Sequence, residues 1–251
     1  MISIVMPIAY DYRYAYGAIA RVYGISDEII LGLDKDRISW SGKTFAFDFE
    51  AFVTQVRKLD PENKIKIVED NFHTEEDPMA NDTRERNILS TACRDGNWIL
   101  QIDSDEYLLN AGDFKTWLRK ANPSHDIQGQ WITVFKSFGN QCLVAQEPNN
   151  QIHIGTRLKN SYKYCRKTGS PTSLSNLQML HYSWGRSRQE LEQKMVNWSH
   201  SKDFDVPKFL EMWDSVTLQN YHTYHDFHPL YGPLWKKLSL LKLPDGLKIA
   251  A

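Results

Sequence analysis

The first hundred residues constrain the fold most, because short apolar runs alternate there with helix-like segments. The strand-like runs are Ile2–Ile8, Glu28–Leu33, Ile65–Val68 and Trp98–Ile102, and the helix-like segments are Tyr12–Val22, Phe47–Leu59 and Thr83–Arg94. This βαβαβαβ order predicts an α/β fold in which helices flank a mainly parallel sheet. A continuously apolar strand such as Glu28–Leu33 suits a sheet that is covered on both faces.

The rhythm changes after residue 110. The pattern predicts a short helix, three less regular strands and two further helices, namely Asp113–Lys120, Gln130–Phe138, Gln141–Gln146, Gln151–Leu158, Gln189–Trp198 and Lys208–Leu218. Pro207 is well placed to begin the last helix. From Asn220 onward no simple period is visible. We therefore expect one domain with an α/β half, residues 1–110, and a second half, residues 111–251, that ends in a helical and irregular extension.

Composition excludes several classes of protein. The chain has 251 residues, 41% of them hydrophobic, and a net charge of −1, which supports an ordinary core and does not favour nucleic acid as a partner. Three widely spaced cysteines without a Cys-x-x-Cys motif suggest reduced core thiols rather than disulfides or a zinc cluster. No run approaches the ~20 apolar residues of a membrane-spanning helix, and the start lacks the features of a signal peptide. These observations predict a cytoplasmic protein.

The strand Trp98–Ile102 ends in the acidic turn Asp103-Ser104-Asp105-Glu106. Ligands of open α/β sheets bind beyond the carboxyl ends of the strands, and hard divalent cations select carboxylate oxygens. Because strand side chains alternate between faces, Asp103 and Asp105 are expected to project to the same side and Glu106 elsewhere. The turn therefore predicts a Mn²⁺ or Mg²⁺ site, although an Asp-x-Asp pair alone is also common at solvated strand ends.

The order of three motifs resembles the central signature of family 2 glycosyltransferases, which have the GT-A fold. Arg84-Glu85-Arg86-Asn87 on a predicted helix precedes the apolar strand and the acidic turn. Ser3–Pro7 is similar to the first strand of that family, and Glu28–Leu33 with Asp34-Lys35-Asp36 is similar to its second strand and acidic turn. The resemblance covers residues 1–110 and implies a nucleotide-diphospho-sugar transferase-like sheet.

The resemblance also implies a set of ligand-binding residues. The nucleoside would lie near Pro7, Ala9, Asp34 and Asp70, and the diphosphate would meet Asp103 and Asp105 through the cation, with Arg86 and Ser104 beside it. The usual Asp-Gly-Ser of the family is replaced here by Asp34-Lys35-Asp36-Arg37. Ordinary turn chemistry is an equal explanation for Asp34 and Asp70, because Asp is favoured where strands end.

A second block, Leu180–Ser187, resembles a His-Tyr-Ser-aromatic segment of some family members. The resemblance implies that His181 is a third metal ligand. Arg186 would neutralise the departing diphosphate through paired hydrogen bonds. A core histidine and a solvated arginine are the alternatives. Tyr182 and Trp184 would either face a sugar ring or fill the core.

The acceptor side is less defined. A reaction that inverts the anomeric centre needs a carboxylate near the acceptor hydroxyl, and the candidate bases are Glu147, Asp203 and Asp205. His222, His225 and His228 have a spacing that suits zinc, although loop packing is the commoner role and similar His-Pro segments suggest an acceptor wall. The stretch from Tyr231 to Leu243, which includes Trp235, Lys236 and Lys237, either contacts a membrane or lipid-linked acceptor or docks as an ordinary C-terminal helix.

These observations together predict a metal-dependent glycosyltransferase that moves a hexose-like sugar from a nucleotide-diphosphate donor to a hydroxyl of a sugar, glycolipid or polysaccharide acceptor. Surface polysaccharide or glycolipid assembly, at the inner face of a membrane, is the expectation that the family supplies. A non-catalytic sugar- or nucleotide-binding module on a degenerate scaffold is the main alternative. A haloacid-dehalogenase-type phosphatase is disfavoured, because that family carries its Asp-x-Asp motif near the start of the chain, whereas Asp103 and Asp105 lie at mid-chain. A nucleotide-sugar pyrophosphorylase is disfavoured because no Gly-rich loop follows Pro7.

Overall fold

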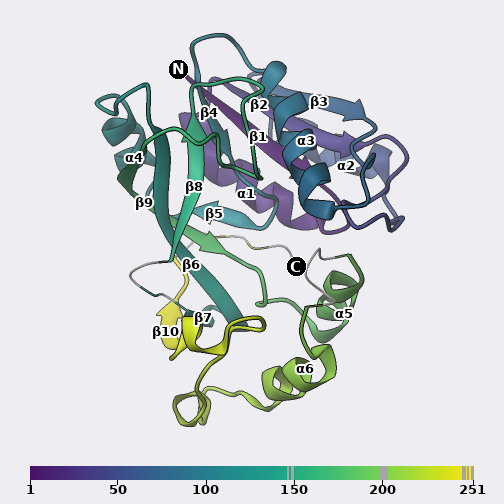
Figure 1. Ribbon diagram of the computed structural model, residues 1–251, viewed down its shortest axis with the longest axis vertical. Coiled ribbons are helices and arrows are strands. Elements are labelled where there is room, and N and C mark those ends of the chain that lie inside the picture. The colour runs from purple at the N-terminus through teal and green to yellow at the C-terminus, as the bar shows by residue number, and fades with distance from the viewer. Residues whose placement is uncertain (146, 148–149, 198–202, 245–246, 248, 250–251) are drawn as a thin grey trace.

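The computed structural model describes residues 1–145, 147, 150–197, 203–244, 247 and 249 (Figure 1). Its first half alternates strands and helices: β1 Ile2–Ile8, α1 Ala15–Val22, β2 Glu28–Asp34, α2 Phe49–Lys58, β3 Ile65–Asp70, α3 Pro78–Thr91 and β4 Trp98–Gln101. Strands β3, β2, β1 and β4 lie in that order and pair in parallel. The predicted elements of residues 1–110 are confirmed, apart from shifts at their ends.

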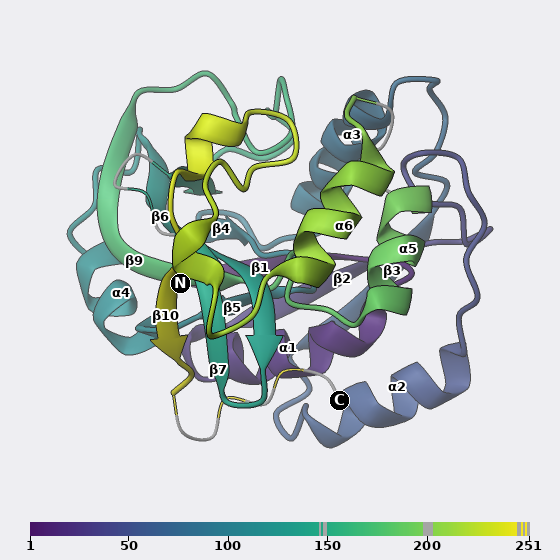
Figure 2. The same cartoon turned by 90° about the horizontal axis from the view of Figure 1, so that it is seen from below.

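The two faces of this parallel sheet are covered by different helices. Val5 and Ile30 point to one face, where they pack with Leu89 of α3. Their neighbours Ile4 and Ile29 point to the other face, into the core that includes residues of α1 and α2. Figure 2 shows α3 on one side of the strands, with α1 and α2 on the other. The continuous apolar strands therefore match burial on both faces.

Helix α3 begins five residues earlier than the sequence pattern predicts. Asp77 caps it by accepting the backbone N–H of Met79, and Pro78 occupies the first turn. Its buried face is largely polar and includes Asn81, Asp82 and Arg86. The first half of the helix therefore lacks the apolar residues at helical spacing that would indicate a helix in the sequence. This explains why the sequence pattern places the start of the helix at Thr83.

The second half of the chain extends the sheet with a different pairing. Its elements are β5 Glu106–Leu108, α4 Ala111–Leu118, β6 Asp126–Phe138, β7 Gln141–Ala145, β8 Gln151–Thr156, β9 Thr172–His181, α5 Arg188–Asn197, α6 Val206–Ser215 and β10 Ser239–Lys242. Strand β8 pairs antiparallel with β4 and with β6, and β7 joins β6 to β10 through antiparallel pairs. Strand β9 runs parallel to β6 and antiparallel to β5. The sheet is therefore mixed: the predicted α/β class is confirmed, and the parallel pairs lie among β1 to β4 and also between β6 and β9.

The C-terminal part has a core of its own, in which aromatic residues of β6, α6 and the connecting segments meet. The indole Nε1 of Trp213 donates to the carbonyl oxygens of Phe135 at 2.7 Å and Trp184 at 3.1 Å. Trp184 and Trp235 are both buried in this core. Trp184 is consequently a core residue, and Trp235 is not exposed to a membrane. Within the described ranges, no helix has the length and apolarity that crossing a membrane requires.

Candidate active site

The carboxyl ends of the four parallel strands meet at one edge of the sheet. Asp34 and Asp70 are register partners at the ends of β2 and β3, and Ala9 follows β1. Pro7 is buried inside β1 opposite Gly32. The acidic turn follows β4 at the same edge, because β4 is parallel to β1. The acidic turn and the residues that were predicted to bind the nucleoside thus lie toward the same edge of the sheet.

Asp34 organises the loop around it. Its Oδ1 accepts the backbone N–H groups of Asp36 and Ile38, each at 3.0 Å, and its Oδ2 accepts that of Phe72 at 2.9 Å. Asp70 accepts the N–H of its neighbour Asn71 at 2.7 Å. The turn role that the sequence left open is therefore present at both positions.

Two arginines hold Asp103. Arg86 of α3 donates to Oδ1 at 2.9 Å, and Arg166, which lies between β8 and β9, lies 2.7 Å from Oδ2. Burial raises the pKa of Asp103, but Arg166 and Arg86 outweigh burial and hold the pKa below its ordinary value. Both oxygens of this carboxylate are therefore engaged by guanidinium groups.

Strand alternation predicts that Glu106 faces away from the turn. In the structure its side chain instead contacts the turn. Its Oε2 accepts the backbone N–H of Asp103 at 2.8 Å, and both of its oxygens lie 2.9 Å from Nη2 of Arg166. Burial raises the pKa of Glu106 to about 7. The physical reason for the difference is that β4 ends at Gln101 and the chain then turns, with the N–H of Glu106 donating to the carbonyl oxygen of Asp103.

Asp105 belongs to a second set of contacts. Nη2 of Arg186 lies 2.6 Å from Oδ2 of Asp105 and 2.7 Å from Oδ2 of Asp11, and the hydroxyl of Ser104 donates to Oδ1 of Asp11 at 3.1 Å. Burial raises the pKa of Asp105, but nearby cationic groups outweigh burial and lower the pKa well below its ordinary value. The Nε of Arg186 is buried and has no hydrogen-bond partner among the described residues.

His181, at the end of β9, lies beside Asp105. Its Nε2 is 3.6 Å from Oδ2 of Asp105, and its ring stacks on Trp131 with the ring centroids 4.4 Å apart. Burial lowers the pKa of His181 to about 4, so its imidazole is neutral at neutral pH. Neutral imidazole is a competent metal ligand.

Lys194 of α5 is a further buried cation close to the acids. Its Nζ donates to the hydroxyl of Ser183 at 2.8 Å, and burial lowers its pKa to about 8. Sequence reasoning missed Lys194, Arg166 and Asp11. Asp11 was signalled by its place three residues after the end of β1, whereas the spacing of Lys194 and Arg166 gives no indication of the site.

The side chains near the acidic turn can be compared with the ligands that a divalent cation needs. Within residues 1–145, 147, 150–197, 203–244, 247 and 249, no group of three or more His, Cys, Asp or Glu side chains is arranged to hold a metal ion. Asp105 and His181 nevertheless lie together and offer a carboxylate and a neutral imidazole. Two such donors fit Mn²⁺ or Mg²⁺ when substrate phosphates and water supply the remaining ligands. Both predicted carboxylate ligands are paired with guanidinium groups in this structure, Asp103 with Arg86 and Arg166 and Asp105 with Arg186, so the ligand role of Asp103 stays a prediction beside that of Asp105.

The remaining candidates belong to the second half of the chain. Glu147 is half-buried after β7, and Asp203 is exposed before α6. Asp205 is exposed and caps α6, with its Oδ1 accepting the N–H of Lys208 at 3.0 Å. His228 accepts the N–H groups of Leu230 and Tyr231 through Nδ1. Tyr182 is buried, and its hydroxyl is hydrogen-bonded to that of Ser137.

Several solved structures match the chain remotely. No family model matches the chain, and no curated protein matches it. HddC from Yersinia pseudotuberculosis is 9% identical with a TM-score of 0.40, covering 72% of this chain and 93% of its own. Glucosyl-3-phosphoglycerate synthase from Mycobacterium tuberculosis, in complex with Mn²⁺, uridine-diphosphate-glucose and phosphoglyceric acid, is 12% identical with a TM-score of 0.40, covering 76% and 74%. An active-site mutant of LgtC is 14% identical with a TM-score of 0.35, covering 62% and 57%. Because these scores are low, we base the function on the geometry of the site.

Proposed function

We propose that this protein is a glycosyltransferase that takes its sugar from a nucleotide-diphosphate donor. The observation that carries the proposal is the acidic turn at the carboxyl edge of four parallel strands, surrounded by buried cationic groups, namely Arg86, Arg166, Arg186 and Lys194. Substrates of open α/β sheets bind at this edge. Buried guanidinium groups match the charge and the hydrogen-bonding geometry of a diphosphate.

The donor would span the edge of the sheet. The nucleoside is proposed to lie near Ala9, Asp34 and Asp70, where β1, β2 and β3 end. Arg86 and Arg166 fix Asp103 and thereby hold the turn in one geometry. Arg186 is proposed to bind the departing diphosphate, because its buried Nε is an unused donor.

Asp105 and His181 would hold Mn²⁺ or Mg²⁺. When bound, the cation supplies charge stabilisation to the leaving diphosphate. Since no group of three or more such donor side chains is arranged to hold a metal ion within the described part of the chain, and the surrounding groups are cationic, we expect the cation to bind strongly only together with a diphosphate. Arg186, whose side chain is 1% exposed, then excludes water from the same region.

The acceptor is proposed to be a hydroxyl of a sugar, glycolipid or polysaccharide. Residues 1–110 are proposed to bind the nucleoside, whereas residues 111–251 contribute His181 and Arg186 to the diphosphate site and form most of the acceptor side. Glu147, Asp203 and Asp205 remain the candidate bases for an inverting reaction. Peripheral contact with a membrane would involve exposed Tyr231 and Lys237 and not the buried Trp235.

One observation favours a second candidate function. Arginines engage Asp103 and Asp105 in this structure, as they would in a module that binds nucleotide-sugars without turnover. A screen of nucleotide-sugars by thermal shift and by hydrolysis, with and without Mn²⁺, separates the two. The wild type, Asp105→Asn and the control Asp113→Asn, an exposed acid of α4, are compared.

For the transferase we expect one donor to stabilise the wild type and Asp113→Asn in a manganese-dependent way and to be hydrolysed slowly. Asp105→Asn should lose both effects. Stabilisation by a donor without hydrolysis, and without any dependence on manganese or Asp105, would support the binding module and contradict the transferase.

A further inference from the structure

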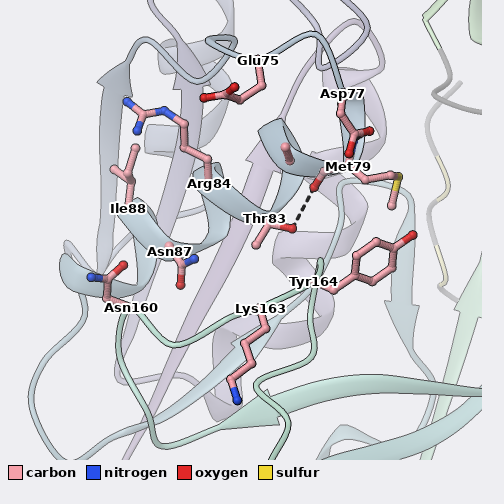
Figure 3. A pocket seen from close by; sticks show the side chains of 11 residues that line it. Glu75, Asp77, Met79, Thr83, Arg84, Asn87, Ile88, Asn160, Lys163 and Tyr164 are labelled. Atoms are coloured by element: carbon pink, nitrogen blue, oxygen red, sulfur yellow. Dashed lines mark hydrogen bonds between the residues drawn. The ribbon is translucent and has the colours of Figure 1, made fainter.

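A groove lies along α3. It has a volume of about 560 Å³ and is lined by α3, by the loop before α3 and by residues 160–164 (Figure 3). Asp82 and Arg86 of α3 belong to the active-site contacts, whereas Thr83, Arg84 and Asn87 line the groove. The active site and the groove therefore share this helix as a wall.

The second wall is fixed to α3 by hydrogen bonds. The amide of Asn87 accepts the N–H of Tyr162 and donates to its carbonyl oxygen, both at 2.9 Å. The hydroxyl of Thr83 accepts the N–H of Cys165 at 2.7 Å and donates to the carbonyl oxygen of Met79, as Figure 3 shows. The groove is thus preformed, as small-molecule sites commonly are.

The charges in the groove balance. Glu75 and Asp77 lie on one side, and Arg84 and Lys163 also line it. Among the described residues, no ion pair engages Glu75, Arg84 or Lys163, and Arg84 donates one long hydrogen bond, 3.4 Å, to the carbonyl oxygen of Asn71. Their charged groups therefore have donors and acceptors left for a ligand. Balanced charge with free donors and acceptors favours a neutral ligand with many hydroxyl groups over a polyanion.

The groove also contains an exposed aromatic ring. Tyr164 is 52% exposed, and Figure 3 shows its side chain beside Met79 at the groove. An exposed ring offers an apolar face to the C–H groups of a sugar, while Arg84 and Glu75 can bond its hydroxyls. A volume of about 560 Å³ lies within the range of small-ligand sites, which is about 300–1,000 Å³.

We propose that this groove binds a neutral saccharide, as a subsite for a distal unit of a glycan acceptor. The acceptor assignment rests on the proposed function, whereas saccharide binding itself does not. Tyr164 stands two residues before Arg166, which holds Asp103 and Glu106. A glycan in the groove therefore contacts the same segment that fixes the acidic turn.

Saturation-transfer NMR with maltotetraose, cellotetraose and chitotetraose tests the binding. The wild type is compared with Tyr164→Ala, with Arg84→Met, with the active-site variant Asp105→Asn and with the control Tyr231→Ala, which removes another exposed tyrosine. We expect one saccharide to bind the wild type, Asp105→Asn and Tyr231→Ala equally. Tyr164→Ala and Arg84→Met should each weaken binding about tenfold, the equivalent of losing one ring or charged contact.

Absence of binding by all three saccharides overturns the proposal, as does binding that both groove variants leave unchanged. Binding that only Asp105→Asn removes would locate the saccharide in the active site and equally overturn it. If turnover is established, Tyr164→Ala should raise KM for the tetrasaccharide and leave KM for its monosaccharide and kcat unchanged. A lack of turnover would contradict the proposed function. The NMR experiment would still test saccharide binding in the groove, because it does not depend on turnover.

Discussion

Asp105 and His181 are the two residues on which metal binding depends in the proposed site. The neutral imidazole lies 3.6 Å from the carboxylate, and no group of three or more donor side chains is arranged to hold a metal ion among the described residues. We predict that His181→Ala raises the manganese concentration needed for half-maximal donor stabilisation about tenfold or more. The measurement is a manganese titration of the thermal shift at a saturating donor concentration.

His225→Ala is the matched control, because His225 is exposed and lies outside the site. It should leave the titration unchanged. An unaltered titration in His181→Ala would return that histidine to a packing role against Trp131.

Glu85 makes stability depend on pH. It is buried beside Trp40, whose Nε1 donates to Oε2 at 2.6 Å, and burial raises its pKa from 4.5 to about 8. Between these values the folded state keeps a proton that the unfolded state releases, so the free energy of unfolding falls as pH rises. Above pH 8 both states are ionised, and the dependence from this group ends.

We predict that Glu85→Gln, which keeps an acceptor for Trp40, flattens the decline between pH 6.5 and 8 and is more stable than the wild type at pH 8. Urea unfolding at several pH values measures this. Glu106, with its pKa raised to about 7, acts in the same direction and leaves a residual slope in the variant. An identical slope in both proteins would show that Glu85 is ionised throughout.

At the scale of the element, α3 connects the active site to the groove. One side carries Asp82 and Arg86, and Asn87 anchors Tyr162 on another. The Arg-Asn motif could be recognised in the sequence, but the segment it anchors could not, since residues 157–171 have no period. The sequence therefore predicted the helix and pointed to Arg86, whose place beside the diphosphate stays a prediction, while Arg166 became visible only when that segment was placed in space.

Loss of the Asn87 anchor should loosen this segment. Asn87→Ala leaves the N–H and the carbonyl oxygen of Tyr162 without partners, and we expect it to destabilise the protein by about 1–3 kcal/mol. Amide hydrogen exchange of residues 158–166 should become faster than in the wild type. Asp48→Ala, which removes the cap of α2, is the control for a comparable loss of stability without that local change. Equal exchange in both variants would contradict the anchor.

At the scale of the whole molecule, the two halves of the sheet differ in how far sequence patterns predict them. Strands β1 to β4 follow from apolar runs separated by helices, because each parallel pair needs a crossover. Strand β9 begins with Thr172-Ser173-Leu174-Ser175-Asn176, a polar stretch that reads as a turn and becomes a strand through pairing with β6. Its end places His181 at the site, so long-range pairing fixes a residue that only a motif had suggested.

Arg186 joins the two halves. It approaches from the chain just before α5, yet it pairs with Asp11 and Asp105 at the edge of the parallel strands, and its side chain is 1% exposed. Removing one partner of a buried ion pair leaves uncompensated charge and costs about 3–5 kcal/mol. Arg188, two residues later, pairs with Glu192 and Asp214 at the surface and is 42% exposed, so its removal should cost about 0–1 kcal/mol.

We therefore predict that Arg186→Met lowers the free energy of unfolding by several times more than Arg188→Met, as measured by urea unfolding. Mn²⁺ should partly restore Arg186→Met, because a cation between Asp11 and Asp105 would replace the guanidinium charge, and it should not affect Arg188→Met. Equal destabilisation of the two variants would mean that Arg186 is not the electrostatic link between the halves. A large loss in Arg186→Met that manganese does not reduce would keep the link but show that Asp11 and Asp105 do not hold a cation when the guanidinium group is removed.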